Sequence, residues 1–441
     1  MKKRILRIVL FLLTALLLSG CGMRTVDQMY CLPRRSETYN ELQSVIDAAM
    51  SGLVYSSPNS GDNQQTVQMA DLNGDGRDEY LVFAKGNTEK PMHILIFRQD
   101  ANGKAKLMET IESSGSAFEQ VIYVDIDEAP GCELVVGRLL SDQVLRSVSI
   151  YTFSNGYAQQ LLSAGYSKFL TCDLDSNGVS ELMVIQPGGS GTRRGTAMLY
   201  SDGPHGVERS REVQLSAPAE SIKRVMTGKL QDGSPAVFVA SSYNENAIVT
   251  DIFANKDQHF TNVSFSYEAG TSVQTLRNYY VYADDVDEDG IVELPSPITM
   301  RPVYGYPNEG EQYLIRWYAL NSQGQETDKL YSFHNFAGGW YLRLDSLRAE
   351  HMSVSQQGNV HLFYMWDEEF QEAAPVFSIY ALTGSDQDAQ AKEQNLFTLH
   401  RTEGVIYAAK LEMASGIYEI TEEQLINSFR LIHQDWKTGE T

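Results

Sequence analysis

The sequence is poor in several residue types whose abundance would point to a particular class of protein. Only four of its 441 residues are cysteine, and none form a Cys-x-x-Cys pair, so the sequence predicts neither a zinc centre nor a disulfide-rich scaffold. Lysine and arginine number 35 against 57 acidic residues. The net charge of −22 argues against a nucleic-acid-binding protein, which needs a basic surface to neutralise phosphates.

Long apolar stretches are absent except for one near the N-terminus. Four basic residues within positions 1–7 precede an apolar run over residues 8–18, which is interrupted only by Thr14. Together with the small residues Ser19 and Gly20, this pattern is typical of a secretory signal peptide and is too short for a membrane-spanning helix of about 20 residues. We therefore expect residues 1–20 to be removed, which takes away four positive charges and no acid and changes the net charge from −22 to −26.

The residues around the expected cleavage site carry further information. Leu18-Ser19-Gly20-Cys21 resembles the lipobox of bacterial lipoproteins. The resemblance implies cleavage before Cys21 and a diacylglycerol group on its sulfur, which would anchor the protein to the outer face of the bacterial cell membrane. The alternative is a secreted protein in which this cysteine occurs by chance.

The remaining cysteines are Cys31, Cys132 and Cys172. Their number is odd, so at least one thiol is expected to stay free. Cys132 and Cys172 lie beside equivalent loops of the repeat described next, and a bridge between these two residues is left open.

An internal repeat organises the central part of the chain. Nine-residue acidic segments begin at Asp71, Asp125, Asp173 and Asp285, and a degenerate copy begins at Gly228. Successive copies start 54, 48, 55 and 57 residues apart, and each is preceded by a strand-like segment, over 66–70, 119–124, 168–172, 222–227 and 279–283. Most copies are also followed by such a segment. Room for four strands in each period of about 50 residues is the signature of a β-propeller blade.

The sequence therefore predicts a mainly β protein. We expect a lipidated tether and an amphipathic helix within 21–58, a β-propeller of about five four-stranded blades over 59–335, and a small α+β domain over 336–441. The last boundary is placed where the period is lost, after His334. A helix is expected from Thr421, which forms a capping box with Gln424, and its apolar stripe would be Leu425, Phe429, Ile432 and Trp436. The alternative is a single seven-bladed propeller.

The acidic segments follow the pattern Asp-x-(Asp/Asn)-x-(Asp/Asn)-Gly-x-x-Glu. The pattern is complete at Asp71, Asp173 and Asp285, and this part of the chain resembles the FG-GAP/VCBS-type β-propellers with calcium loops. The copy at Asp125 departs from the pattern, because Ala129 and Pro130 replace the third ligand and the glycine.

Oxygen ligands at positions 1, 3, 5 and 9, with the carbonyl of position 7, suit Ca²⁺. We expect the ion to be structural, with loop 285–293 contributing most and loop 125–133 empty; the alternative for each loop is a turn that holds no ion. The predicted ligands are Asp71, Asn73, Asp75, Arg77 and Glu79; Asp173, Asp175, Asn177, Val179 and Glu181; and Asp285, Asp287, Asp289, Ile291 and Glu293.

Three classes of function remain open. The leading interpretation is a binding or interaction module for an extracellular protein or glycan. The second is an enzyme that acts on extracellular polysaccharide or peptidoglycan, and the third is a structural component of the envelope. The sequence points to no catalytic residue: the eight histidines form no His-x-x-x-His pair, and the acidic residues after Trp366 are expected at a solvated strand end. Converging acids in the channel of the propeller would favour the enzyme.

The lipobox leads to a direct prediction. Replacement of Cys21 by alanine removes the only sulfur that can accept the lipid, so Cys21→Ala should leave the protein uncleaved or release it into the medium. Membrane fractionation and the mass of the processed chain measure both effects. A variant that is processed normally and stays in the membrane fraction would contradict lipid anchoring.

Overall fold

The computed structural model describes residues 37–100, 104–140, 145–189, 193–204, 206–279, 281–303, 311–367, 372–412 and 419–432. The signal peptide, Cys21, Cys31 and Trp436 lie outside these residues. The chain divides into two compact units, which we describe separately. The first contains the described residues of Met1–Ser57, Gln65–Ala70 and Arg77–Ser114, and the second contains Pro58–Gln64, Asp71–Gly76 and Gly115–Thr441. None of the described helices is both long and apolar enough to cross a membrane.

The first unit consists of one helix packed on an antiparallel sheet. Helix α3 (Glu37–Ala49) buries Leu42 and Ile46 against the sheet, which confirms the expected helix, and Gly52 follows it with a φ of +81°. The strand order is β1-β3-β4-β5, and β2 also pairs with β3. The strands are β1 (Val54–Tyr55), β2 (Val67–Ala70), β3 (Glu79–Lys85), β4 (Met92–Gln99) and β5 (Ala105–Ser113).

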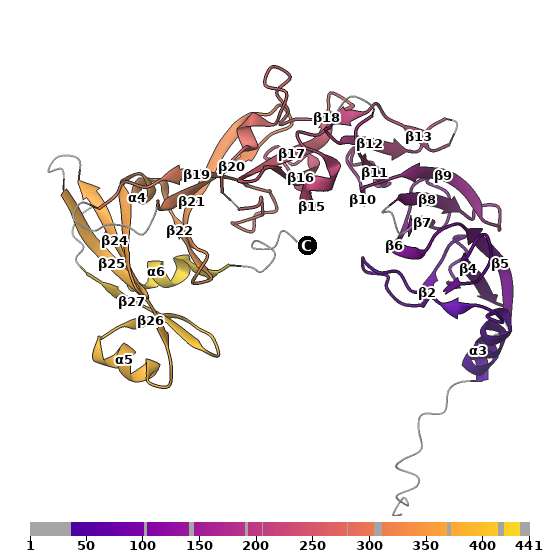
Figure 1. Ribbon diagram of the computed structural model, residues 1–441, viewed down its shortest axis with the longest axis horizontal. Coiled ribbons are helices and arrows are strands. Elements are labelled where there is room, and N and C mark those ends of the chain that lie inside the picture. Colours follow the sequence, from indigo (N-terminus) through magenta and orange to yellow (C-terminus); the bar gives the residue numbers. More distant parts are fainter. Residues whose placement is uncertain are drawn as a thin grey trace, which may run out of the picture. The chain divides into compact units, whose positions relative to one another are not determined.

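The second unit contains five antiparallel sheets, each built mainly from consecutive strands, as the colours of Figure 1 show. The first three sheets begin with strands that match the repeat. They contain β6 (Ala117–Val124), β7 (Glu133–Leu139), β8 (Arg146–Thr152) and β9 (Gln159–Gly165); β10 (Lys168–Cys172), β11 (Glu181–Gln186), β12 (Thr196–Ser201), β13 (Glu208–Arg209) and β14 (Val213–Gln214); and β15 (Ile222–Lys229), β16 (Pro235–Asn244), β17 (Ala247–Lys256) and β18 (His259–Asn262). Two short 3₁₀ turns, η1 (Ala219–Ser221) and η2 (Val273–Thr275), complete this region.

The second strand of each of these sheets is apolar on both faces. In β11, for example, Leu182 and Val184 pack towards the preceding sheet, whereas Met183 and Ile185 pack towards the following one. One hydrophobic cluster joins the β6–β9 sheet to the β10–β14 sheet, and another joins the latter to the β15–β18 sheet. This stacking explains why the second strands are continuous apolar runs, since no face of these strands meets water.

The fourth sheet of the second unit departs from the sequence prediction. The described residues of the segment 279–283, expected to be its first strand, form no strand; only Asp284 bridges to Glu293. The sheet has the order β19-β20-β21-β22-β28 and extends across residue 336, so the expected domain boundary lies in the turn between two paired strands. Its strands are β19 (Leu294–Thr299), β20 (Tyr313–Leu320), β21 (Glu326–Asn335), β22 (Trp340–Leu344) and β28 (Phe429–Leu431).

The last sheet and three short helices are formed by residues 346–428. The sheet order is β23-β24-β25-β27-β26, and β26 and β27 form a hairpin around Glu403 and Gly404. The elements are α4 (Ser346–His351), β23 (Met352–Gln357), β24 (Val360–Asp367), β25 (Glu372–Thr383), α5 (Gln387–Glu393), β26 (Phe397–Arg401), β27 (Val405–Leu411) and α6 (Glu422–Ser428).

The C-terminal helix is shorter than predicted. The capping box is confirmed, because the Gln424 backbone N–H donates to Thr421 Oγ1 (3.1 Å) and the Thr421 N–H donates to Gln424 Oε1 (3.0 Å). The expected continuation of the helix through Phe429 and Ile432 is wrong: Phe429 begins strand β28, which pairs with β22. Pairing with a free sheet edge and stacking of Phe429 on Trp340 (5.6 Å between ring centroids) outweigh the helical periodicity.

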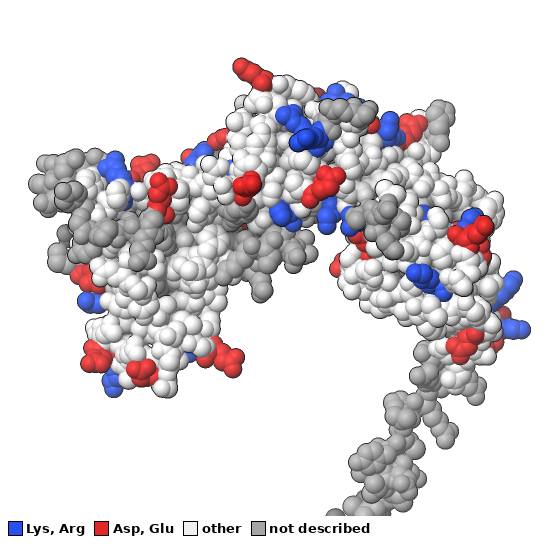
Figure 2. Space-filling model, in the orientation of Figure 1, with Lys and Arg blue, Asp and Glu red and all other residues white. Residues whose placement is uncertain are grey.

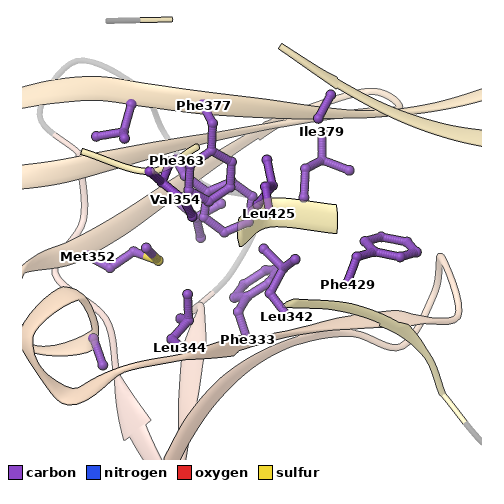
Figure 3. Packing of buried hydrophobic residues seen from close by; sticks show 14 of the residues in the cluster. Phe333, Leu342, Leu344, Met352, Val354, Phe363, Phe377, Ile379, Leu425 and Phe429 are labelled. Carbon is purple, nitrogen blue, oxygen red and sulfur yellow. The ribbon is translucent and has the colours of Figure 1, made fainter. Parts of the chain in front are cut away.

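Both ends of this region contribute to one core between the last two sheets. Figure 3 shows Phe363 and Phe377 together in this cluster; their rings stack with 4.6 Å between centroids. Leu425 of α6 and Phe429 of β28 also belong to the cluster. Burial of a side chain of this size contributes about 2 kcal/mol, so the C-terminal segment is an integral part of this core.

A buried histidine lies near this core. His334 of β21 shares a hydrogen bond of 2.7 Å with Ser332 Oγ, which also accepts from the Trp317 indole N–H (2.7 Å). Burial lowers the pKa of His334 to about 3, so this side chain stays neutral in the folded protein over a wide pH range.

Because His334 is buried in its neutral form, we expect the free energy of unfolding to fall at acidic pH. The unfolded chain takes up a proton near the ordinary histidine pKa of about 6.5, whereas folded His334 does not, so its contribution is present above pH ~6.5 and is lost as the pH falls towards ~3. We expect the stability difference between the wild type and His334→Gln to shrink by up to about 1.4 kcal/mol per pH unit in that window. Urea unfolding at several pH values measures the difference. A difference that does not change with pH would contradict the buried neutral state.

Candidate metal loops and a cavity at the sheet edges

The acidic segments share one backbone arrangement. The carboxylate at position 1 accepts the N–H of position 6 in each complete copy, from Gly76 to Asp71 (2.8 Å), from Gly178 to Asp173 (3.0 Å) and from Gly290 to Asp285 (2.8 Å). All three glycines have positive φ, between +81° and +90°, which confirms the turn expected at position 6. Position 4 is also left-handed, even where it is Ser176 or Glu288. The first carboxylate therefore fixes the turn around itself.

The glutamate at position 9 fastens the other end of the loop. In loops 125–133, 173–181 and 285–293, its Oε2 accepts the N–H of position 2, at 2.8 to 2.9 Å. Glu133 and Glu181 begin strands, Glu293 directly precedes β19, and all three glutamates are at most 3% exposed. Burial raises the pKa of Glu133, that of Glu181 to about 7 and that of Glu293 to about 8, since a buried carboxylate loses its hydration.

Three loops bring carboxylates together closely enough to share a metal ion. Within each group, one oxygen from every residue lies within 4.8 Å of the others. The groups are Asp125, Asp127 and Glu133; Asp173, Asp175 and Glu181; and Asp285, Asp287 and Asp289. In loop 285–293, the buried oxygens Asp287 Oδ1 and Glu293 Oε1 accept no hydrogen bond, so their donor sets fit an oxygen-ligated cation.

Loop 125–133 differs from the expectation, because its acids converge although the sequence predicts a loop that holds no ion. Its backbone keeps the left-handed position 4 at Glu128, with a φ of +56°. The turn glycine is shifted by one position to Gly131, which has a φ of +113°. The acids at positions 1, 3 and 9 are retained and converge. The three acids could have indicated this convergence from the sequence alone. The departures from the pattern at Ala129 and Pro130 led instead to the prediction of an empty loop.

Loop 285–293 already contains a cation from a neighbouring strand. Lys329 of β21 forms an ion pair with Asp289, with 2.8 Å between Nζ and Oδ2. The hydrogen bond from Lys329 lowers the pKa of Asp289, whereas burial raises the pKa of Asp287. A metal ion in this loop would therefore compete with Lys329 for one of its ligands.

Loop 71–79 is divided between the two compact units, so we describe its halves separately. In the second unit, the N–H groups of Gly74, Asp75 and Gly76 all donate to Asp71. In the first unit, Glu79 forms an ion pair with Arg98 of β4, with 2.7 Å between Oε1 and Nε. The charge of this buried glutamate is thus compensated by a side chain.

The degenerate copy at Gly228 is a hydrogen-bonded turn. Asp232 accepts the N–H groups of Ser234 (3.1 Å) and Ser322 (2.8 Å). Partial burial would raise the pKa of Asp232, but these hydrogen bonds lower it to about 2. This aspartate therefore links two turns of the backbone.

Sequence reasoning missed a buried polar network around Asp251 of β17. Its carboxylate is fully buried and accepts the Ser216 N–H (2.8 Å) and the hydroxyls of Ser216 and Ser272 (both 2.6 Å), as well as the Asn262 side-chain N–H (2.8 Å). An aspartate within the apolar segment 247–254 was the available signal. All of these hydrogen bonds join Asp251 to other parts of the chain. The network therefore holds residues 262–275 against the sheet.

A cavity of about 730 Å³ lies inside the second unit. Its walls are the first strands of three sheets, β6, β10 and β15, together with residues 60–63. The Ser60 N–H and the Asn63 side-chain N–H donate to carbonyls of β6, at Glu119 (2.8 Å) and Val121 (3.1 Å). Among the described residues, β10 pairs with β11 alone, and β15 pairs with β16 apart from one bridge between Lys229 and Ile291 at its end. Three sheet edges thus meet at one polar cavity.

The cysteine bridge that the sequence leaves open does not form. Cys132 and Cys172 are both thiols. Burial raises the pKa of Cys172 to about 12, so this thiol stays protonated and unreactive at neutral pH.

Comparison with known proteins gives no family assignment. No family model matches the chain, and no curated protein matches it. Similar solved structures include the exotype rhamnogalacturonan lyase YesX (TM-score 0.32, 12% identity, 74% of this chain and 65% of that one) and the rhamnogalacturonan lyase YesW (0.29, 10%, 73% and 64%). A third is the Bacillus licheniformis rhamnogalacturonan lyase PL11 (0.27, 12%, 73% and 72%). The match spans slightly less than two thirds of the YesX and YesW chains.

The ion pair of loop 285–293 leads to a prediction. Lys329→Gln removes the cation that contacts Asp289, so without divalent metal the variant should lose about 1 kcal/mol of stability. Added calcium should recover more stability in the variant than in the wild type, because Asp289 is then free to bind it. Urea unfolding in chelator and in calcium measures both effects.

Lys392→Gln, at an exposed lysine of α5, is the matched control and should change neither value. An equal loss for Lys329→Gln in chelator and in calcium would show that this loop takes no metal.

Proposed function

We propose that this protein is a lipid-anchored binding module on the outer face of a bacterial cell membrane. The observation that carries the binding role is the composition of the cavity at the sheet edges. Among its lining residues, Asp62 is the only acid, and none is a histidine. Glycoside hydrolysis by the usual route needs two carboxyl groups, and general acid–base catalysis most often uses histidine, so the cavity favours binding over turnover. The anchor is inferred from residues 18–21.

We further propose that the sheets are blades of a β-propeller. Five sheets occur where the sequence repeat predicts five blades, and each sheet of the second unit shares a hydrophobic cluster with the next along the chain. Residues 352–411 form a single further sheet in the described part of the chain, which supports a C-terminal addition more than two extra blades. The first strands would then surround the axis, where β6, β10 and β15 line the cavity.

Calcium is the proposed structural cofactor of the loops. Its hard oxygen ligands would come from positions 1, 3, 5 and 9 and the carbonyl of position 7, and the ion would neutralise clustered carboxylates at the ends of the hairpins. Among the complete copies, loop 173–181 is the best candidate, because none of its three converging acids is ion-paired with another described residue, whereas Glu79 and Asp289 of the other two are. Outside the cell, even sites with a Kd of about 10⁻⁴–10⁻³ M would be occupied.

The metal proposal predicts a calcium-dependent stability. Chelation should lower the melting temperature of the wild type, and calcium should restore it better than magnesium; at about a hundredfold excess over Kd, one site contributes roughly 2.7 kcal/mol. Asp175→Ala should reduce the calcium-dependent shift, whereas Asp202→Ala, at an exposed carboxylate outside the loops, should leave it unchanged. Melting that does not respond to chelator or calcium, with no metal found by elemental analysis, would remove the calcium proposal.

A pull-down with the lipidated chain from intact cells, in calcium and in chelator, tests the binding role. We expect an envelope component to be retained in calcium, but not by a variant in which Lys168 and Lys223, which line the cavity, are both glutamine. A pull-down that retains no more than beads without the protein would contradict a binding module. Steady turnover of an envelope polysaccharide by the purified protein would also contradict it.

A further inference from the structure

The cavity between β6, β10 and β15 has a charge opposite to that of the whole protein. It is lined by Lys168, Lys223 and Arg224 and by one acid, Asp62, in a chain whose net charge is −22. On the face shown in Figure 2, acidic and basic side chains are interspersed. Positive charge concentrated in a concave site raises the local concentration of anions, and this effect is stronger in a cavity than on an open surface.

The lysines of the cavity are available to a ligand. Lys168 and Lys223 are exposed, and neither forms an ion pair with any other residue that the structure describes. Arg224, next to Lys223 on β15, is 6% exposed. The strand register shifts between Ile222 and Arg224, which indicates a β-bulge at Lys223.

The other polar groups of the cavity suit hydroxyl-bearing ligands. Gln120 and Thr171 supply amide and hydroxyl groups, beside Ser60 and Asn63, whose side chains donate to carbonyls of β6. The outer edges of β10 and β15 supply backbone N–H and C=O groups. The only aromatic lining residue is Phe169, which is buried in the cluster with Tyr166. The cavity therefore lacks the stacking surface on which single-stranded nucleic acids bind.

We propose that this cavity binds an anionic oligosaccharide, with Lys168 and Lys223 contacting its acidic groups and the buried Arg224 adding positive charge to the cavity wall. The inference rests on the proposed binding role and specifies its ligand class. A volume of about 730 Å³ falls within the range of small-ligand sites, roughly 300–1,000 Å³, and accommodates a short segment of a glycan chain. Charge supplies the attraction, and the hydroxyl, amide and backbone groups supply the orientation.

The metal loops adjoin this cavity along the chain. Strands β6 and β10 end at Val124 and Cys172, and the acidic loops begin at the next residues, Asp125 and Asp173. An ion in either loop would fix the end of a strand that lines the cavity. Ligand binding is thus expected to weaken when the loops are emptied by a chelator.

The test compares two sugar hexamers that differ only in charge. Isothermal titration of the full chain with cellohexaose and with its C6-carboxylated counterpart should show binding of the carboxylated hexamer alone, with affinity that falls at high salt. Lys168→Gln and Lys223→Gln should each weaken binding by about two- to fivefold, and the double variant by about tenfold. Lys392→Gln, outside the cavity, should bind like the wild type, and circular dichroism verifies that every variant is folded.

Three outcomes would overturn the inference: equal binding of the neutral hexamer, unchanged binding by the double lysine variant, or full displacement by sulfate at matched charge concentration. An oligonucleotide that binds more tightly than the carboxylated hexamer would also overturn it. If the hexamer fails while the pull-down still retains an envelope component, the ligand class is wrong and the binding role stands. If both fail, the proposed function is wrong as well.

Discussion

The architecture depends on how buried carboxylates at the beginnings of strands are compensated. In loops 125–133 and 173–181, one oxygen of the position 9 glutamate accepts the backbone N–H of position 2, which ties the exit of one strand to the entry of the next. A carboxylate at this depth needs a partner for its charge. Glu79 has Arg98, whereas Glu133, Glu181 and Glu293 lie among further acids. A proton or a cation would compensate these carboxylates, and Lys329 does so in part in loop 285–293.

The local part of this design could be predicted from the sequence. Glycines in a left-handed turn and aspartates that accept neighbouring N–H groups are determined within nine residues, so the complete loops and most flanking strands were predicted correctly. Prediction failed where partners are distant. Phe429 follows a helical pattern, yet the open edge of β22 draws it into a strand, and the tyrosine-rich segment 279–283 forms no strand in its described residues.

The cavity and the Asp251 network were beyond local reasoning for a related reason. The cavity combines residues 60–63 with strands that begin at Ala117, Lys168 and Ile222, and no spacing rule connects these positions. From the sequence alone, Lys168 at the start of β10 is an ordinary solvated charge. Its place in a cavity becomes evident only when the neighbouring sheet edges are known. Asp251 was visible as an anomaly in an apolar strand, but its four donors come from three other segments.

Strand β28 has a consequence for the order in which the protein can assemble. The earlier sheets pair strands that follow one another closely, so each can form as soon as its own segment has been made. The β19–β22 sheet is completed only when Leu342 meets Phe429, after the whole β23–β27 sheet has been synthesised in between. The edge of β22 therefore stays open until the end of the chain arrives. A chain interrupted before residue 429 would carry an unpaired, apolar-flanked edge, which marks incomplete copies for aggregation or proteolysis.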